Sequence, residues 1–302
     1  MNRLKRKNAV PAAQGVPAAG INQVTWKERL ASYRRDPLSL ALRLVVCLAA
    51  AITAAVLLAL IAYILIRGIP HLKPSLFELH YNSENVSMFP AMVMTLYMTV
   101  LCLLIATPLG VGCAIYLTEY AKSSKIVKAI SFAVDSLSGI PSILYGLFGM
   151  TMFVTVLNFK WSLLSGSLTL AIMILPVIIR VCQESLITVP TEYKEGSFAM
   201  GATKLKTLVK IVLPCTSRGI VTAIILSIGR IVGETAAVYL TAGMVNRVPE
   251  SIMDSGRTLS VHLYMLAKEA ISFEQAFGTA TVLIVIILIV NTATNLIVRE
   301  KK

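Results

Sequence analysis

EGSFAMGATKLKTLVKIVLP, residues 195–214, is a polar stretch between two apolar runs that are each long enough to cross a membrane. Pro190 ends the helix before it, and Gly201 is expected to close a short helix, because glycine suits the positive φ found just beyond a helix end. A second short helix is predicted over residues 203–213, where Pro214 stops it. The stretch therefore predicts two short helices that lie outside the bilayer.

The second of these short helices is amphipathic, with its lysines pointing away from an apolar face. That face consists of Leu205, Leu208, Val209 and Val212. It can rest on the membrane domain of its own chain, which leaves the first helix free to contact another protein. An ordinary amphipathic loop between two membrane helices would show the same periodicity.

The spacing of five residues is more specific than this periodicity. Gly201 follows Glu195 by six residues, and Ile211, Leu213 and Pro214 come after it in that order. The spacing resembles the cytoplasmic EAA loop of ABC-importer permeases, which those proteins insert into a cleft of their ATPase subunit. The amphipathic periodicity of an ordinary loop does not require this spacing of five residues.

The resemblance implies that a coupling loop of about residues 189–214 transmits the movement of a separate ATPase. The residues it assigns to this coupling are Glu195, Phe198, Gly201, Ile211 and Pro214. Gly196 and Ser197 stand where the family usually has two alanines. Both lower helix propensity by up to about 1 kcal/mol relative to alanine, so a slightly looser coupling helix is expected.

The composition excludes a soluble globule. Of the 302 residues, 56% are hydrophobic and 14% charged, and the mean hydropathy is +0.77. We expect an all-α, polytopic membrane protein, because each apolar run is long enough to span the hydrocarbon as a helix. The six predicted spans are residues 44–66, 91–117, 129–155, 166–188, 216–245 and 275–298.

The net charge of +13 could suggest a nucleic-acid partner, but the positions of the lysines and arginines explain it differently. With the N-terminus in the cytoplasm, 21 of them fall on the cytoplasmic side, 6 fall in outer loops, and Arg230 alone lies within a span. This is the positive-inside distribution. It predicts cytoplasmic termini, a cytoplasmic coupling loop and no nucleic-acid partner.

Residues 1–40 are predicted to form a cytoplasmic tail with a possible interfacial helix, and residues 41–302 the membrane domain. The five cysteines fall in spans or at a cytoplasmic end and predict no disulfide. His71, His80 and His262 fall in outer loops without metal-ligand spacing, and ordinary solvated histidines are expected. No metal or cofactor is expected to bind this chain.

The second and third spans contain helix breakers where a simple membrane anchor would have none. They include Pro108 in the second span, and Gly139 and Pro141 in the third. A carbonyl left without its donor by proline is tolerated in lipid only against protein or a hydrated cavity. We expect these breaks to line the bundle interior, either beside a substrate pathway or in close helix packing by small residues.

The fifth span carries two charges, Arg230 and Glu234, which are one turn apart if the helix is continuous. An ionised side chain at mid-bilayer costs on the order of 2.5–3.5 kcal/mol, so each must face protein or water. One interpretation is a self-compensated ion pair that only locks two helices. Alternatively, the arginine binds an oxyanion while the glutamate accepts a proton from it, which suits phosphate better than sulfate.

Two further motifs carry a closer resemblance. SGIPSILYGLFG, residues 138–149, and GETAAVYLTAG, residues 233–243, look like the permeases of phosphate importers, and the Thr-Ala-Gly ending favours the PstA-type subunit over its PstC-type partner. With the EAA-like loop, the similarity covers about residues 40–300. The resemblance implies a type I ABC importer permease fold in the bacterial inner membrane, with a phosphate pathway at Arg230, Glu234, Thr235 and Tyr239.

In that family the permease pair works with a dimeric cytoplasmic ATPase and an extracytoplasmic phosphate-binding protein. No Walker-type loop occurs in this chain, so ATP and Mg²⁺ are expected on the partner ATPase. A PstC-type permease, a permease for another oxyanion, and a secondary transporter or channel remain as alternatives. A secondary transporter should carry an internal repeat, and an intramembrane enzyme a nucleophile with a base; neither pattern is found.

Overall fold

The computed structural model describes residues 37–82, 85–121, 125–269 and 271–300, and in these ranges the regular structure is entirely helical. The chain divides into two compact units, Met1–Ile61 and Ala62–Lys302. The predicted tail and interfacial helix lie almost wholly outside the described residues. The described part of the first unit belongs to helix α2, whose apolar side chains are mostly exposed, as a lipid-facing span requires.

The described helices follow the predicted order. They are α2 (Pro37–Gly68), α3 (Phe89–Ile115), α4 (Lys125–Ser138), α5 (Ser142–Gly149), α6 (Leu163–Ile187), α7 (Thr191–Ala199), α8 (Lys204–Thr207), α9 (Leu213–Gly233), α10 (Ala236–Thr241), α11 (Leu259–Lys268) and α12 (Phe273–Glu300). Five are long and apolar enough to cross a membrane, or six if the bent pair α4 and α5 counts as one span. The prediction of an all-α polytopic membrane protein is confirmed.

The third span is broken at the position that its helix breakers predict. Helix α4 ends at Ser138, and α5 begins after Pro141. The two helical segments are bent by 105° relative to each other. Gly139 favours the helix poorly, and Pro141 restricts the residue before it to extended backbone. The Tyr145 hydroxyl donates to the Leu137 carbonyl at 2.7 Å and so satisfies a group that the break frees.

The fifth span is also interrupted, which corrects the prediction of one helix over residues 216–245. Helix α9 ends at Gly233, Glu234 is extended with ψ 129°, and α10 begins at Ala236. The buried Ser260 hydroxyl of α11 reaches the carbonyls of Val232 and Glu234 at 3.1 and 2.8 Å. These bonds occupy carbonyls that a continuous helix would have paired.

Pro108 does not break its span, contrary to expectation. Helix α3 continues through it to Ile115, and the proline is exposed at the surface of this chain. A proline inside a helix removes one backbone donor and costs about 3 kcal/mol, but it need not end the helix. Of the three predicted breakers, Gly139 and Pro141 lie at an observed break, whereas Pro108 does not.

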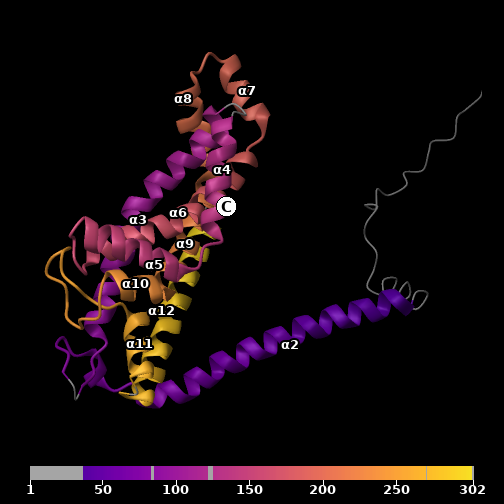
Figure 1. Cartoon of the computed structure of the whole chain (residues 1–302). Coiled ribbons are helices and arrows are strands. Elements are labelled where there is room, and N and C mark those ends of the chain that lie inside the picture. The colour runs from indigo at the N-terminus through magenta and orange to yellow at the C-terminus, as the bar shows by residue number, and fades with distance from the viewer. Residues whose placement is uncertain (1–36, 83–84, 122–124, 270, 301–302) are drawn as a thin grey trace, which may run out of the picture. The chain divides into compact units, whose positions relative to one another are not determined.

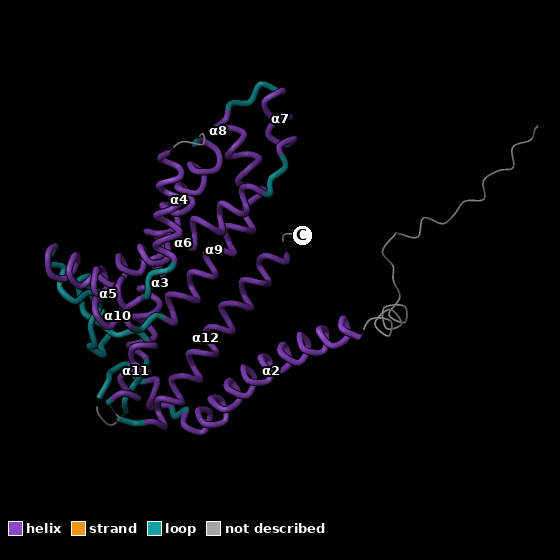
Figure 2. The backbone as a smooth tube through the Cα atoms, turned by 45° about the vertical axis from the view of Figure 1, so that its right-hand side comes forward, coloured by secondary structure: helices purple, strands orange, loops and turns teal. Residues whose placement is uncertain are grey.

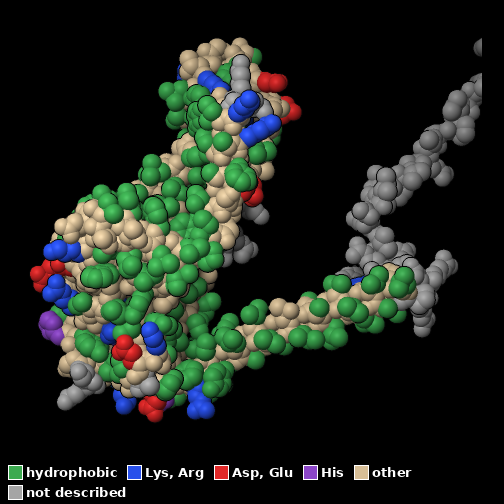
Figure 3. All heavy atoms as spheres, in the orientation of Figure 1, with side chains coloured by type: hydrophobic (Ala, Val, Ile, Leu, Met, Phe, Trp, Pro, Cys, Tyr) green, Lys and Arg blue, Asp and Glu red, His purple; other side chains and the backbone are tan. Residues whose placement is uncertain are grey.

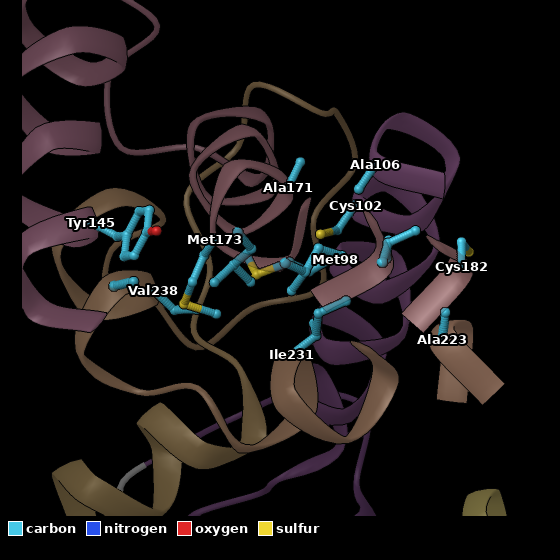
Figure 4. Close-up of a cluster of buried hydrophobic side chains, with 14 of the residues drawn as sticks. Met98, Cys102, Ala106, Tyr145, Ala171, Met173, Cys182, Ala223, Ile231 and Val238 are labelled. Atoms are coloured by element: carbon cyan, nitrogen blue, oxygen red, sulfur yellow. The ribbon is translucent and has the colours of Figure 1, made fainter. Parts of the chain in front are cut away.

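The core lies among α3, α6 and α9, with α5 and α10 packed beside them. Figure 4 shows Met98 and Cys102 from α3 close to Met173 of α6, with Ile231 of α9 below them. All four side chains are almost completely buried. All five cysteines are free thiols, as predicted.

Within the unit of residues 62–302, the coupling loop and helix α11 lie at opposite ends. Helices α7 and α8 form one end, and α11 lies at the other (Figures 1 and 2). Charged side chains gather at both ends, whereas hydrophobic side chains cover most of the surface between them (Figure 3). This distribution matches a bundle whose middle faces lipid and whose ends face water.

Candidate functional site

The first short helix of the coupling loop forms as predicted. Helix α7 begins after Pro190 and ends at Ala199, and Gly201 has φ +80°. The backbone N–H of Gly201 donates to Phe198 O at 2.9 Å, and the next N–H donates to Ser197 O at 3.1 Å. Glycine is needed here because a residue with a Cβ is strained at that φ.

The second short helix does not end at Pro214, which corrects the predicted boundary. From Lys204 the chain is helical without a gap to Gly233, with a π-helical turn, Leu208–Val212, just before the proline. A π turn changes the hydrogen-bond register, which suits a residue that has no N–H to donate. The coupling loop is therefore directly continuous with the membrane helix α9.

The apolar face predicted for this helix is only half covered. Leu208 and Val212 are buried against the chain's own bundle, whereas Leu205 and Val209 are more than half exposed. Thr203 starts the helix by accepting a hydrogen bond from Lys206 N at 3.3 Å. The helix thus rests on its membrane domain by one edge and presents the other.

Two polar contacts hold α7 against the bundle. The Ser197 and Thr207 hydroxyls are buried and 2.8 Å apart. The Lys194 ammonium lies 2.6 Å from Glu119 Oε1, and these side chains are only 21% and 12% exposed. Because Ser197 stands where the family usually has alanine, the departure gives its hydroxyl a buried partner. Sequence reasoning missed Glu119, since it is 75 residues from Lys194.

The remaining coupling candidates lie at the surface. Glu195 and Phe198 on α7 are exposed, as is Pro214, and Ile211 is half-buried. Phe198 is 46% exposed and the neighbouring Met200 83%. An apolar and acidic surface at the tip of a loop is what a docking helix would present.

The charged candidates do not form the ion pair that helical spacing predicts. Arg230 lies in the last turn of α9, and Glu234 lies beyond the helix end. Instead, Glu234 Oε1 accepts a hydrogen bond from Ala237 N at 3.2 Å and caps α10. Arg230 and Glu234 are both half-buried, and within the described residues no carboxylate pairs with Arg230. The interpretation as a self-compensated pair is wrong.

The other two pathway candidates lie beside this break. Thr235 links α9 to α10, and Tyr239 on α10 makes an edge-to-face contact with Tyr264 at 5.9 Å between ring centroids. The Lys268 ammonium lies 5.7 and 5.4 Å from the centroids of these two rings. A hydrogen bond with Tyr264 raises the pKa of Lys268. Sequence reasoning missed this cation, although Tyr264 and Lys268 have the i,i+4 spacing of a helical pair.

The two interrupted spans pack directly against each other. A Cβ added to Gly146 of α5 would lie 2.9 Å from the Cα of Ala237 on α10, which leaves no room for a side chain. Gly139 and Pro141 are exposed on this chain, as is Pro108, so any lining role would require a second subunit. Apart from the adjacent residues and their own helix, no described residue lies within 4 Å of a Cβ added to Gly229 or Gly233. The surface beside Arg230 is therefore open.

Asp135 and His262 have structural surroundings that the sequence did not predict in full. Asp135 of α4 forms an ion pair with Arg180 of α6, which indicates a packing role for its carboxylate. His262 is completely buried in α11, not solvated in an outer loop. It is buried because the segment folds back on the bundle, where Leu259 N donates to Thr95 Oγ1 of α3 at 2.9 Å.

Comparison with known proteins identifies the family. Residues 106–300 match the family described as "Binding-protein-dependent transport system inner membrane component". The chain belongs to this family. It is therefore a multi-pass inner-membrane transport subunit of the ABC importer class.

Two relatives span most of the chain. It is 30% identical to a probable ABC transporter permease, YqgI of Bacillus subtilis, over 82% of this chain and 90% of that protein. It is 34% identical to the phosphate transport system permease PstA 1 of Mycobacterium tuberculosis, over 69% of each. The resemblance to PstA-type permeases is thus confirmed.

Solved structures support the fold. A bacterial ABC transporter involved in alginate import matches with a TM-score of 0.63 and 16% identity, over 90% of this chain and 99% of that one. The MetNI methionine transporter in an inward-facing conformation matches with a TM-score of 0.56 and 20% identity, over 71% and 94%. At these identities the likeness concerns the ABC importer permease fold alone.

Proposed function

We propose that this chain is the PstA-type permease of an ATP-driven importer of inorganic phosphate. The observation that carries the proposal is the half-buried Arg230, which has no carboxylate partner among the described residues and lies where two interrupted spans meet. The relatives named as phosphate permeases support the substrate. A guanidinium provides a planar fork of donors that matches a tetrahedral oxyanion.

Glu234 would supply the discrimination between oxyanions. One of its oxygens caps α10, and the carboxylate can still accept a hydrogen bond from a protonated ligand. Phosphate at neutral pH carries a proton, whereas sulfate is fully ionised and would be repelled. Thr235 and Tyr239 would add hydroxyl groups to the same passage.

The coupling loop would transmit movement to this passage through one continuous helix. The exposed face of α7, with Glu195 and Phe198, would enter a cleft of a dimeric cytoplasmic ATPase. Since α8 and α9 are joined without a gap, a displacement of Gly201 and its helix would be carried along α9 to Arg230. A rigid helix can transmit such a shift over its whole length.

The other partners follow from the same scheme. A sister permease would cover the open surface beside Arg230, where Gly229 and Gly233 let another helix approach closely. An extracytoplasmic phosphate-binding protein would deliver the substrate, and lipid would surround the bundle. The partner ATPase would bind ATP and Mg²⁺, so this chain needs no cofactor of its own and no nucleic acid.

Uptake of radiolabelled phosphate tests this function directly. Cells that lack the chain should regain ATP-dependent phosphate uptake when it is restored, and excess sulfate or phosphonate should compete weakly. Strong competition by either anion would assign the importer to that anion. A PstC-type role predicts restoration in cells that lack only the sister subunit, which gives the second arm of the experiment.

A further inference from the structure

A second arginine lies at the opposite end of the bundle from the coupling loop. Arg257 lies two residues before α11 begins at Leu259 and is only 6% exposed. Its Nε and Nη2 atoms are buried and make no hydrogen bond with the described residues. These two nitrogens form one edge of the guanidinium, the edge that binds an oxyanion through two parallel hydrogen bonds.

His262 lies near the start of α11 and feels the charge of Arg257. It is completely buried, and neither ring nitrogen has a hydrogen-bond partner among the described residues. Burial, and then the charge of Arg257, lower the pKa of His262 to about 3. The ring is therefore neutral at neutral pH and offers one N–H donor and one acceptor nitrogen.

Among the described residues, no carboxylate forms an ion pair with Arg257. The Tyr81 ring lies 4.9 Å from the guanidinium carbon, and a side-chain hydrogen bond with Tyr81 also favours the charged arginine. Glu269, which is exposed, acts on the arginine through space but forms no ion pair with it. A buried charge without a partner is strongly unfavourable. An anion on the Nε and Nη2 edge would remove this penalty.

A surface cavity lies beside this neighbourhood and shares Tyr81 with it, although neither Arg257 nor His262 lines the cavity. It has a volume of about 430 Å³ and is lined by Tyr81, the residue whose ring covers Arg257. His80, Asn246 and Arg247 contribute donors to its wall, and Glu250 is the acidic group there. Tyr81 thus lines this cavity and also contacts the buried arginine.

We propose that Arg257 and His262 form an oxyanion-binding site that receives phosphate before it reaches Arg230. Arg257 holds two ligand oxygens through Nε and Nη2, and the His262 N–H can donate to a third. The proposal rests on the proposed function for the identity of the anion and for the direction of movement. The existence of an oxyanion site at Arg257 and His262 does not depend on the proposed function.

Thermal unfolding of the complete importer, purified without the binding protein and without ATP, tests the site. At constant ionic strength, phosphate at ten times its dissociation constant should raise the melting temperature by about 2 °C through binding to the native state. The Arg257→Gln and His262→Phe complexes should lose this rise. Every complex also carries Arg230→Met, so that binding at Arg230 does not contribute, and Arg67→Gln, an arginine change elsewhere in the same unit, should keep the rise.

Two additional arms keep the result unambiguous. If Arg257→Gln does not assemble, Arg257→Lys should assemble and need roughly tenfold more phosphate, because an ammonium lacks the fork. Glycerol 3-phosphate, titrated in parallel, represents a lipid headgroup. A rise with glycerol 3-phosphate but not with phosphate would overturn the proposal, as would an equal rise in Arg257→Gln or none in the complex that carries Arg230→Met alone.

Uptake assays separate this proposal from the proposed function. If the unaltered importer transports phosphate but Arg257→Gln retains the full thermal rise, the outer site is wrong and the function stands. If the unaltered importer does not transport phosphate, the function is wrong. A thermal rise that depends on Arg257 would then still establish an oxyanion site.

Discussion

The two ends of helix α9 handle interrupted backbone in different ways. At the coupling end the chain closes its turn with Gly201 and ties α7 down through Ser197 and Lys194. At the other end, Ser260 and Glu234 satisfy the groups freed by the break, but Arg230 keeps no carboxylate partner. The first end is built to hold a shape, and the second leaves a charge available for a ligand.

The largest effect is expected at the coupling end. Gly201→Val should reduce phosphate uptake by on the order of a hundredfold or more, because a β-branched residue at φ +80° carries strain of about 1–3 kcal/mol and would reshape the turn. Uptake is measured at equal membrane expression. Gly196→Ala is the matched control, since a Cβ there meets nothing within 4 Å, and it should leave uptake unchanged. Normal uptake in Gly201→Val would remove the docking turn from the mechanism.

At the other end, Glu234→Gln should change selectivity more than rate. The amide oxygen can still cap α10 at Ala237 N, so the fold should survive. The amide can also donate to sulfate, and the preference for phosphate should fall by about tenfold, or 1.4 kcal/mol. The measurement is inhibition of phosphate uptake by sulfate. An unchanged inhibition constant would exclude Glu234 from discrimination.

A smaller effect is expected when α7 is released from the bundle. Lys194→Met and Glu119→Gln should each lower uptake by about threefold to tenfold, because each breaks a mostly buried pair worth about 1 kcal/mol or more. Exchanging the two charges should restore part of the loss, as a double-mutant cycle on uptake would show. Lys206→Met, an exposed change on α8, is the control. Additive losses without recovery would mean that the pair does not position α7.

The smallest effect on uptake is expected at Ser260, which supports the break between α9 and α10. Ser260→Ala leaves the carbonyls of Val232 and Glu234 without this donor and should lower stability by about 1–3 kcal/mol. Thermal unfolding of the purified complex measures this loss. Ser217→Ala removes an exposed hydroxyl of α9 and should have little effect. An equal loss in both variants would show that the break does not depend on Ser260.

The sequence predicted the features that depend on local chemistry. The positive φ of Gly201 follows from residue type and spacing. The break at Pro141 was marked by Gly139 two residues before it. The order of the apolar spans followed from hydropathy, and the predicted six agree with the structure when the bent pair α4 and α5 counts as one span.

The features that it missed depend on distant contacts. The break after Gly233 is supported by Ser260, which is 28 residues from Val232 in sequence. The burial of His262 requires its segment to fold back on Thr95 of α3. Pro108 carries the same local signal as Pro141 and yet lies inside a continuous helix. No short window of sequence distinguishes these cases, because tertiary packing decides them.

The central claim, that Arg230 binds the transported oxyanion, is tested most directly by the double change Arg230→Met with Glu234→Leu. The measurement is radiolabelled phosphate uptake by an importer that assembles with its ATPase at normal levels. The account predicts almost no uptake in the double variant, as in Arg230→Met alone, because apolar side chains offer no donor to a dehydrated oxyanion. Full recovery of uptake in the double variant would contradict it and leave both residues with a structural role only.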